Sequence, residues 1–70
     1  MRVITSPMAG TVARLLVTEG DVVAVGQDIV ILESMKMEIA IQTEADGRVK
    51  AVKVGVGEFV DEGSILLELE

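Results

Sequence analysis

The sequence predicts an all-β protein built from two copies of one short β unit. When the 70-residue chain is aligned with itself at an offset of 37, its halves match without a gap. Three glycines of the first half then coincide with glycines of the second, at positions 10/47, 20/57 and 26/63. Between them stand short runs rich in valine and isoleucine, and none has the periodicity of an amphipathic helix. Residues 1–33 and 38–70 are therefore interpreted as two units related by a pseudo-twofold repeat.

Each unit is expected to hold four strands separated by turns that contain glycine. The expected strands are residues 2–5, 11–17, 22–23 and 28–33 in the first unit, and residues 37–42, 48–54, 59–60 and 65–69 in the second. The second strand of each unit breaks simple alternation, because two of its apolar residues are three positions apart (12 and 15, 49 and 52). A bulge or bend is therefore predicted near Arg14 and Ala51, which suits a small, strongly curved sandwich.

The two units are joined by a predicted β-hairpin at the centre of the chain. Apolar runs at residues 29–32 and 39–41 flank a short polar link, as in a hairpin with a tight turn. If Met35 and Lys36 are the two loop residues, cross-strand partners have numbers that sum to 71. The pairs are then apolar on both sides: Leu32 with Ile39, and Val30 with Ile41. Since a slip of one residue would send these side chains to the wrong face, this register places Lys36 at an exposed tip.

Two local preferences are broken around this lysine. Two-residue loops favour Asn-Gly or Asp-Gly because both central residues need a positive φ, and Met35-Lys36 satisfies neither preference. The same register sets Glu33 opposite Glu38, and like charges directly opposite destabilise a ladder. An ordinary surface lysine is the simple alternative. Breaches of this kind occur at functional sites, however, so the tip is the candidate site of the chain.

The composition excludes several classes of function. The net charge is −6, which argues against nucleic-acid binding because that requires a basic surface. Without histidine or cysteine, the chain offers no Cys-His or Ser-His pair and no His/Cys metal cluster. It is not expected to be a catalyst alone. Residues 1–5 lack the apolar segment of a signal peptide, and no run approaches the ~20 residues of a membrane span. We therefore expect a cytoplasmic protein that does not enter a membrane.

The tip carries a resemblance to a known family. Ser34-Met35-Lys36-Met37 resembles the Ala-Met-Lys-Met acceptor motif of biotinyl domains, the carriers of biotin-dependent carboxylases. The segment at residues 6–10 (Ser-Pro-Met-Ala-Gly) is similar to their Pro-Met-Pro-Gly segment, and the turns at 19–23 and 26–27 to their Gly-Asp and Gly-Gln turns. The chain departs from the pattern at Ser34 and Ala9. The resemblance covers residues 1–70 as one domain and implies a flattened eight-strand barrel-sandwich with the lysine on a hairpin at one end.

By this resemblance, Lys36 is biotinylated by a biotin protein ligase. Because an exposed lysine amine is protonated at neutral pH, the ligase must supply an activated biotin and a base. Met35 and Met37 would give flexible apolar contact to the ligase or to carboxylase active sites, unless Met37 packs in the core. Glu33, Ser34 and Glu38 are expected to take part in ligase recognition.

The resemblance further implies that the attached biotin carries a carboxyl group between biotin carboxylase and carboxyltransferase sites, the remaining partners of the chain. Two alternatives stay open. One is lipoyl carriage, which uses the same fold but usually has Asp-Lys-Ala or a similar sequence at the tip. The other is an unmodified barrel-sandwich module for protein interaction.

The repeat makes one further prediction about the ends of the chain. If a twofold axis relates the units, the contact between the end of the first unit and the start of the second must have a mate. Shifting the hairpin pairs by 37 residues gives that mate: Leu69 with Arg2, and Leu67 with Ile4. The first and last strands should therefore pair antiparallel and close a sheet edge, and both termini should lie at the end of the domain opposite Lys36.

Overall fold

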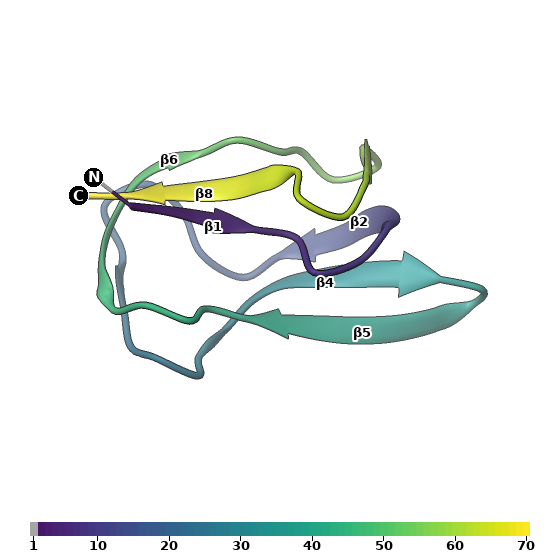
Figure 1. The fold of residues 1–70 in the computed structure, drawn as a ribbon, viewed down its shortest axis with the longest axis horizontal. Coiled ribbons are helices and arrows are strands. Elements are labelled where there is room, and N and C mark those ends of the chain that lie inside the picture. The colour runs from purple at the N-terminus through teal and green to yellow at the C-terminus, as the bar shows by residue number, and fades with distance from the viewer. Residues whose placement is uncertain (1) are drawn as a thin grey trace.

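A computed structural model describes residues 2–70 as two antiparallel sheets of four strands each, with no helix in this part of the chain (Figure 1). The strands are β1 Arg2–Thr5, β2 Gly10–Leu15, β3 Val22–Val23, β4 Asp28–Ser34, β5 Met37–Gln42, β6 Gly47–Val52, β7 Phe59–Val60 and β8 Ile65–Leu69. All eight predicted strands are present. Among the described residues there is accordingly no helix long and apolar enough to cross a membrane.

Three of the predicted strands have boundaries that are wrong by one or two residues, five boundaries in all. The strands expected at 11–17 and 48–54 begin one residue earlier and end two residues earlier, and β4 extends to Ser34 instead of residue 33. Past Leu15 the chain turns away from the ladder, although the Leu16 N–H still donates to the Ile29 carbonyl at 2.9 Å. The hydrogen bonding thus continues for one residue beyond the regular strand. A run of apolar residues does not show where the regular strand ends within the hydrogen-bonded segment.

The two units are interleaved in both sheets. The strand orders are β1-β8-β6-β3 and β5-β4-β2-β7, so each sheet takes two strands from each unit. Four of the six strand pairings join one unit to the other. The molecule is elongated, with extents of 32 × 18 × 17 Å. Neither unit could bury its own apolar face without the other.

The predicted twofold relation is confirmed at the level of single residues. β1 pairs with β8 through Arg2 with Leu69 and Ile4 with Leu67, as the shifted hairpin register requires. The ladders shift register between Val12 and Arg14 and between Val49 and Ala51, which confirms the predicted bends. Both ends of the described chain, Arg2 and Glu70, lie at one end of the molecule and the β4–β5 turn at the other (Figure 1). We call these ends the terminal pole (Arg2 and Glu70) and the hairpin pole (residues 34–37).

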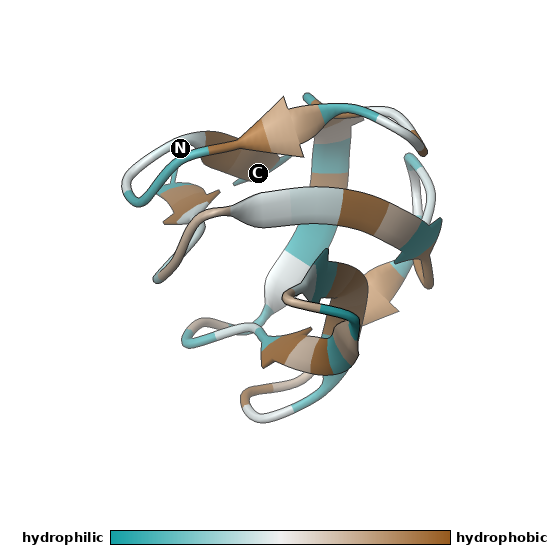
Figure 2. Ribbon diagram, turned by 90° about the vertical axis from the view of Figure 1, so that its right-hand side faces the viewer, coloured by the Kyte–Doolittle hydropathy of each residue, from teal (hydrophilic) through white to brown (hydrophobic). Residues whose placement is uncertain are grey.

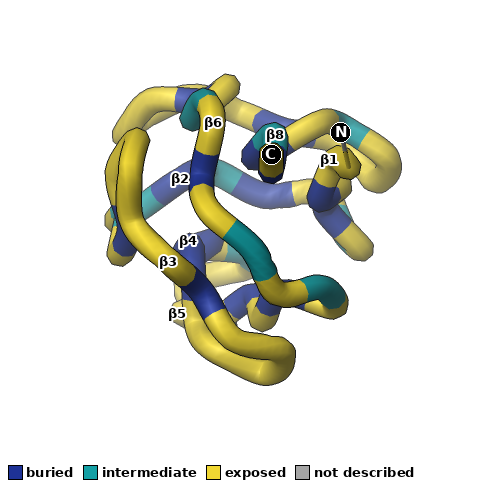
Figure 3. Tube along the Cα trace, turned by 90° about the vertical axis from the view of Figure 1, so that its left-hand side faces the viewer, coloured by how far each residue is buried: buried dark blue, intermediate teal, exposed yellow. Residues whose placement is uncertain are grey.

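The core between the sheets is aliphatic. Its fully buried side chains include Val12, Ile29, Leu32, Val49 and Leu66, and hydrophobic and hydrophilic segments alternate along the strands (Figure 2). Seen from the terminal pole, the buried stretches of the strands face one another across the interior (Figure 3). Within residues 2–70, no buried side-chain nitrogen or oxygen lacks a hydrogen-bond partner. The result is a close-packed support for the strands that lead to the hairpin pole.

Candidate functional site

The candidate site is the tip of the β4–β5 hairpin. The register pairs Leu32 with Ile39 and Glu33 with Glu38, and ends with Ser34 opposite Met37. Met35 and Lys36 are therefore the two loop residues, which confirms the register predicted from the sequence. Further from the tip, Val30 and Ile41 pair and are both buried. This apolar ladder holds the hairpin in one register.

The turn has an unusual backbone. Met35 has a φ of 52° and Lys36 a φ of 66°, and no other residue than glycine among 2–70 has a positive φ. Positive φ at both central residues is what a type I′ hairpin turn requires. For an L-residue other than glycine this conformation costs about 1–2 kcal/mol. The flanking ladder imposes the turn on two residues that do not favour it, and such local strain persists only where the surrounding structure determines it.

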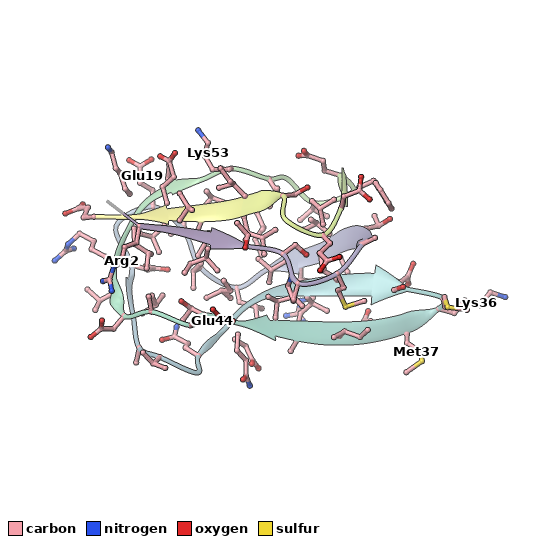
Figure 4. The ribbon with its side chains drawn as sticks, in the orientation of Figure 1. Arg2, Glu19, Lys36, Met37, Glu44 and Lys53 are labelled. Atoms are coloured by element: carbon pink, nitrogen blue, oxygen red, sulfur yellow. The ribbon has the colours of Figure 1, made fainter. Side chains whose placement is uncertain are left out.

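The side chains of the tip point into solvent. Met35 is 93% exposed and Met37 64% exposed, so the alternative in which Met37 packs in the core is wrong. The reason is that the ladder between β2 and β4 ends at Thr11 and Glu33, and residues 34–37 project beyond the sandwich. Figure 4 shows Lys36 extended away from the strands along the long axis and Met37 pointing outward from β5 in a different direction. No hydrogen bond or ion pair among the described residues engages the Lys36 amine.

Two glutamates lie in the ladder directly before the turn. Glu33 and Glu38 are exposed and face each other across the ladder, which confirms the predicted pairing of like charges. Ser34 is half-buried and lies opposite Met37. Lys36 is the one basic residue of the hairpin sequence from 28 to 42. The tip therefore presents one cation on a hairpin whose other charged residues are all acidic.

The structure adds one residue that sequence reasoning did not bring to this site. On the outer face of the sheet, the register aligns Glu38 with Glu33, Glu33 with Thr11, and Thr11 with Phe59. Phe59 is the only aromatic residue of the chain and is 60% exposed. Its place on a short strand at residues 59–60 was predicted from the sequence. Its place in this row depends on the pairing of β7 with β2, for which the sequence offers no local pattern.

The other two lysines have different surroundings. Lys50 lies within β6, at the register shift between Val49 and Ala51. Lys53 forms an ion pair with Glu68 at 4.0 Å. Neither lies at a hairpin tip: Lys53 follows β6 directly, and its N–H donates to the Leu66 carbonyl at 2.9 Å. Lys36 is thus distinguished by its place in the fold as well as by its neighbours in sequence.

The geometry suits presentation of an amine. A hollow of about 340 Å³ opens between β1 and the turn after β5, and residues 33–38 take no part in its lining. Within residues 2–70, no group of three or more Asp and Glu side chains is arranged to hold a metal ion. What the hairpin pole offers is one protruding primary amine on a two-residue turn, between two exposed thioethers. A primary amine in this position can be acylated by a second protein.

Comparison with known proteins identifies relatives that match nearly the whole of this chain. The sequence pattern of the biotin/lipoyl family, described as that of a biotin-requiring enzyme, matches residues 2–69. The biotin/lipoyl attachment protein of Bacillus subtilis is 52% identical over 62 residues, which are 89% of this chain and 85% of that protein. The mitochondrial propionyl-CoA carboxylase alpha chain of Homo sapiens is 44% identical over 68 residues, which are 97% of this chain.

A solved structure agrees with these sequence relatives. A single-chain, multi-domain long-chain acyl-CoA carboxylase superposes with a TM-score of 0.85 at 32% identity and covers 94% of this chain. The shared region is a small part of each carboxylase: 9% of the human alpha chain and 6% of the long-chain enzyme.

Proposed function

Because this chain belongs to the biotin/lipoyl family of biotin-requiring enzymes, we propose that it is a biotin carrier domain whose Lys36 bears biotin in amide linkage. The observation that carries the proposal is the Lys36 amine at the hairpin pole. It projects from a two-residue turn, is unpaired among the described residues, and stands between two exposed methionines. An amine without an intramolecular partner can be acylated without breaking a contact that stabilises the fold.

The residues around the lysine have separate roles in this proposal. A biotin protein ligase would recognise Met35 and Met37 by apolar contact, and Glu33, Ser34 and Glu38 by polar contact. When attached, biotin carries a carboxyl group between a biotin carboxylase site and a carboxyltransferase site. The chain itself supplies presentation and is not catalytic alone. Its net charge of −6 favours brief encounters with several partners, since charge governs the rate of association more than its strength.

The position of the termini supports a role as a tethered carrier. The ends of the described chain lie at the terminal pole, and the long dimension of the molecule is 32 Å. A connection made at that pole would leave the hairpin pole facing outward. Lipoyl carriage is the second candidate, because the Bacillus subtilis relative is named for both attachments. The Met-Lys-Met sequence at the tip favours biotin.

The test is intact-mass measurement after co-expression with a biotin protein ligase, and separately with a lipoyl ligase. We expect one biotin per chain and no lipoyl group. Lys36→Arg keeps the charge but removes the amine that forms the amide, so this variant should stay unmodified. Lys53→Arg is the matched control and should be modified as fully as the native chain. Biotin on the Lys36→Arg variant would refute the assignment.

A second measurement uses charge. Acylation converts an ammonium into a neutral amide, so the formal charge should change from −6 to −7. The modified chain should therefore run closer to the anode on a native gel. Equal mobility of two species that differ by the mass of biotin would contradict attachment to a lysine.

A further inference from the structure

The chain has few side chains that an oxidant can attack. It contains no cysteine, histidine, tryptophan or tyrosine, and four methionines. Methionine is converted to its sulfoxide by mild oxidants, and accessible sulfur reacts first. Oxidation of this protein must therefore fall on methionine, and the exposure of each methionine decides where.

The described methionines differ sharply in exposure. Met35 and Met37 are 93% and 64% exposed, whereas Met8 is half-buried and packs against the aliphatic core. Met1 lies outside the described residues. The two accessible thioethers thus belong to the residues directly before and after Lys36 in the sequence, at the hairpin pole.

We propose that Met35 and Met37 form a reversible oxidation site that controls modification of Lys36. The proposal rests on the function proposed above. In each step a sulfur lone pair attacks one oxygen of hydrogen peroxide, the O–O bond breaks, an S–O bond forms and water leaves. The sulfur loses two electrons and the peroxide gains them. Methionine sulfoxide reductases reverse the change, with a thiol as reductant and water as the released oxygen.

Oxidation at this place changes recognition and leaves the fold intact. Neither side chain lies in the core, so a polar sulfoxide here displaces no buried packing. On contact with another protein, however, the S–O group must be desolvated, and this is unfavourable without a hydrogen-bond partner. A surface that receives two flexible apolar side chains would thus accept the oxidised tip poorly. Met8 is the internal contrast, because its oxidation would introduce a polar group at the edge of the core.

The experiment uses the complete, unmodified chain. It is treated with hydrogen peroxide for increasing times, the peroxide is removed with catalase, and each sample is digested with trypsin. Cleavage after Arg14, Lys36 and Arg48 places the three described methionines on separate peptides. We expect Met35 and Met37 to be oxidised several times faster than Met8, with an unchanged far-UV spectrum. Oxidation of Met8 at the same rate as both tip methionines would overturn the proposed selectivity.

The same samples are then offered to the biotin protein ligase. We expect the initial rate of biotinylation to fall severalfold when both methionines are sulfoxides, and to return after treatment with the two reductases that act on the two epimers. In the double variant Met35→Leu/Met37→Leu, peroxide should leave the rate at that variant's own untreated value. An equal loss in this variant would assign the effect to another residue and overturn the proposal.

The outcomes separate this inference from the function on which it rests. If the untreated native chain gains no biotin on Lys36, the proposed function fails. If it gains biotin at the same rate before and after complete oxidation of both methionines, the carrier function stands and the oxidation control is refuted.

Discussion

Replacing Met35 by asparagine should stabilise the protein. Met35 holds a φ of 52°, a conformation that costs an ordinary L-residue about 1–2 kcal/mol. Asparagine tolerates this region because its short polar side chain forms local hydrogen bonds. The substitution removes almost no packing, since Met35 is 93% exposed. We therefore expect the free energy of unfolding to rise by about 1 kcal/mol, the lower end of the strain that the turn imposes.

Met37→Asn is the matched control. It makes the same substitution at a neighbouring methionine that is also exposed, at 64%, but whose φ is not positive. Asparagine is disfavoured in strands, so this variant should be slightly less stable than the native chain. The contrast isolates the backbone of the turn from the general effect of exchanging a methionine for a small polar residue.

The measurement is urea and thermal unfolding followed by far-UV circular dichroism, because the chain has no tryptophan or tyrosine. A gain of about 1 kcal/mol corresponds to a rise of about 4–8 °C in Tm for a domain of this size. The denaturant m-value should stay the same, since the surface exposed on unfolding does not change. A Met35→Asn variant no more stable than the native chain, or an equal gain from Met37→Asn, would refute the reasoning from positive φ.

Three further predictions concern the ladder, a close contact and the interleaved units. Glu38→Lys replaces a repulsive cross-strand pair by an attractive one and should raise the free energy of unfolding by a few tenths to about 1 kcal/mol, with a smaller gain in high salt. It should also slow biotinylation by the ligase, and an unchanged ligase rate would leave the carboxylate pair without a role in recognition. Gly10→Ala should lower the free energy of unfolding in urea by about 1–3 kcal/mol, because the new Cβ would lie 3.0 Å from a carbonyl oxygen of β4. Gly55→Ala is the control and should be nearly neutral, because a Cβ there meets nothing within 4 Å. Separate peptides 1–33 and 38–70 should show no β spectrum alone and recover it when mixed, since four of the six strand pairings join the units; a folded single peptide would contradict this.

Much of the fold could be predicted because the two units share the same pattern of apolar residues and glycines, so that a register found in one unit applies to the other. The hairpin register followed from two apolar pairs, and the repeat then determined the pairing of β1 with β8 without any further evidence. The bends near Arg14 and Ala51 followed from apolar residues three positions apart in both copies. In each case a wrong register or a straight strand would have exposed apolar side chains that the structure buries or half-buries against the core.

The parts that could not be predicted depend on contacts between distant segments. Strand β7 has only two residues, too few for a pattern to specify β2 as its partner. The position of Phe59 in the same cross-strand row as the glutamate pair, with Thr11 between them, was therefore not predicted. The exposure of Met37 depends on how far the hairpin extends beyond β2. The length of this extension is set by the packing of the whole sandwich, and the alternation of residues along β5 does not predict it.

The symmetry also explains why the tip can hold residues that a hairpin turn disfavours. The β1–β8 ladder has the same register as the β4–β5 ladder but no turn between its paired ends, because Arg2 and Leu69 belong to opposite ends of the described chain. Its pairing rests on the ladder itself, on the buried side chains Ile4, Leu67 and Leu69, and on the pairing of β8 with β6, without a turn. A ladder of this kind therefore does not require a favourable turn to form. At the hairpin pole the same packing can support the strained backbone of Met35 and Lys36, which frees both positions for residues chosen by what they present to another protein.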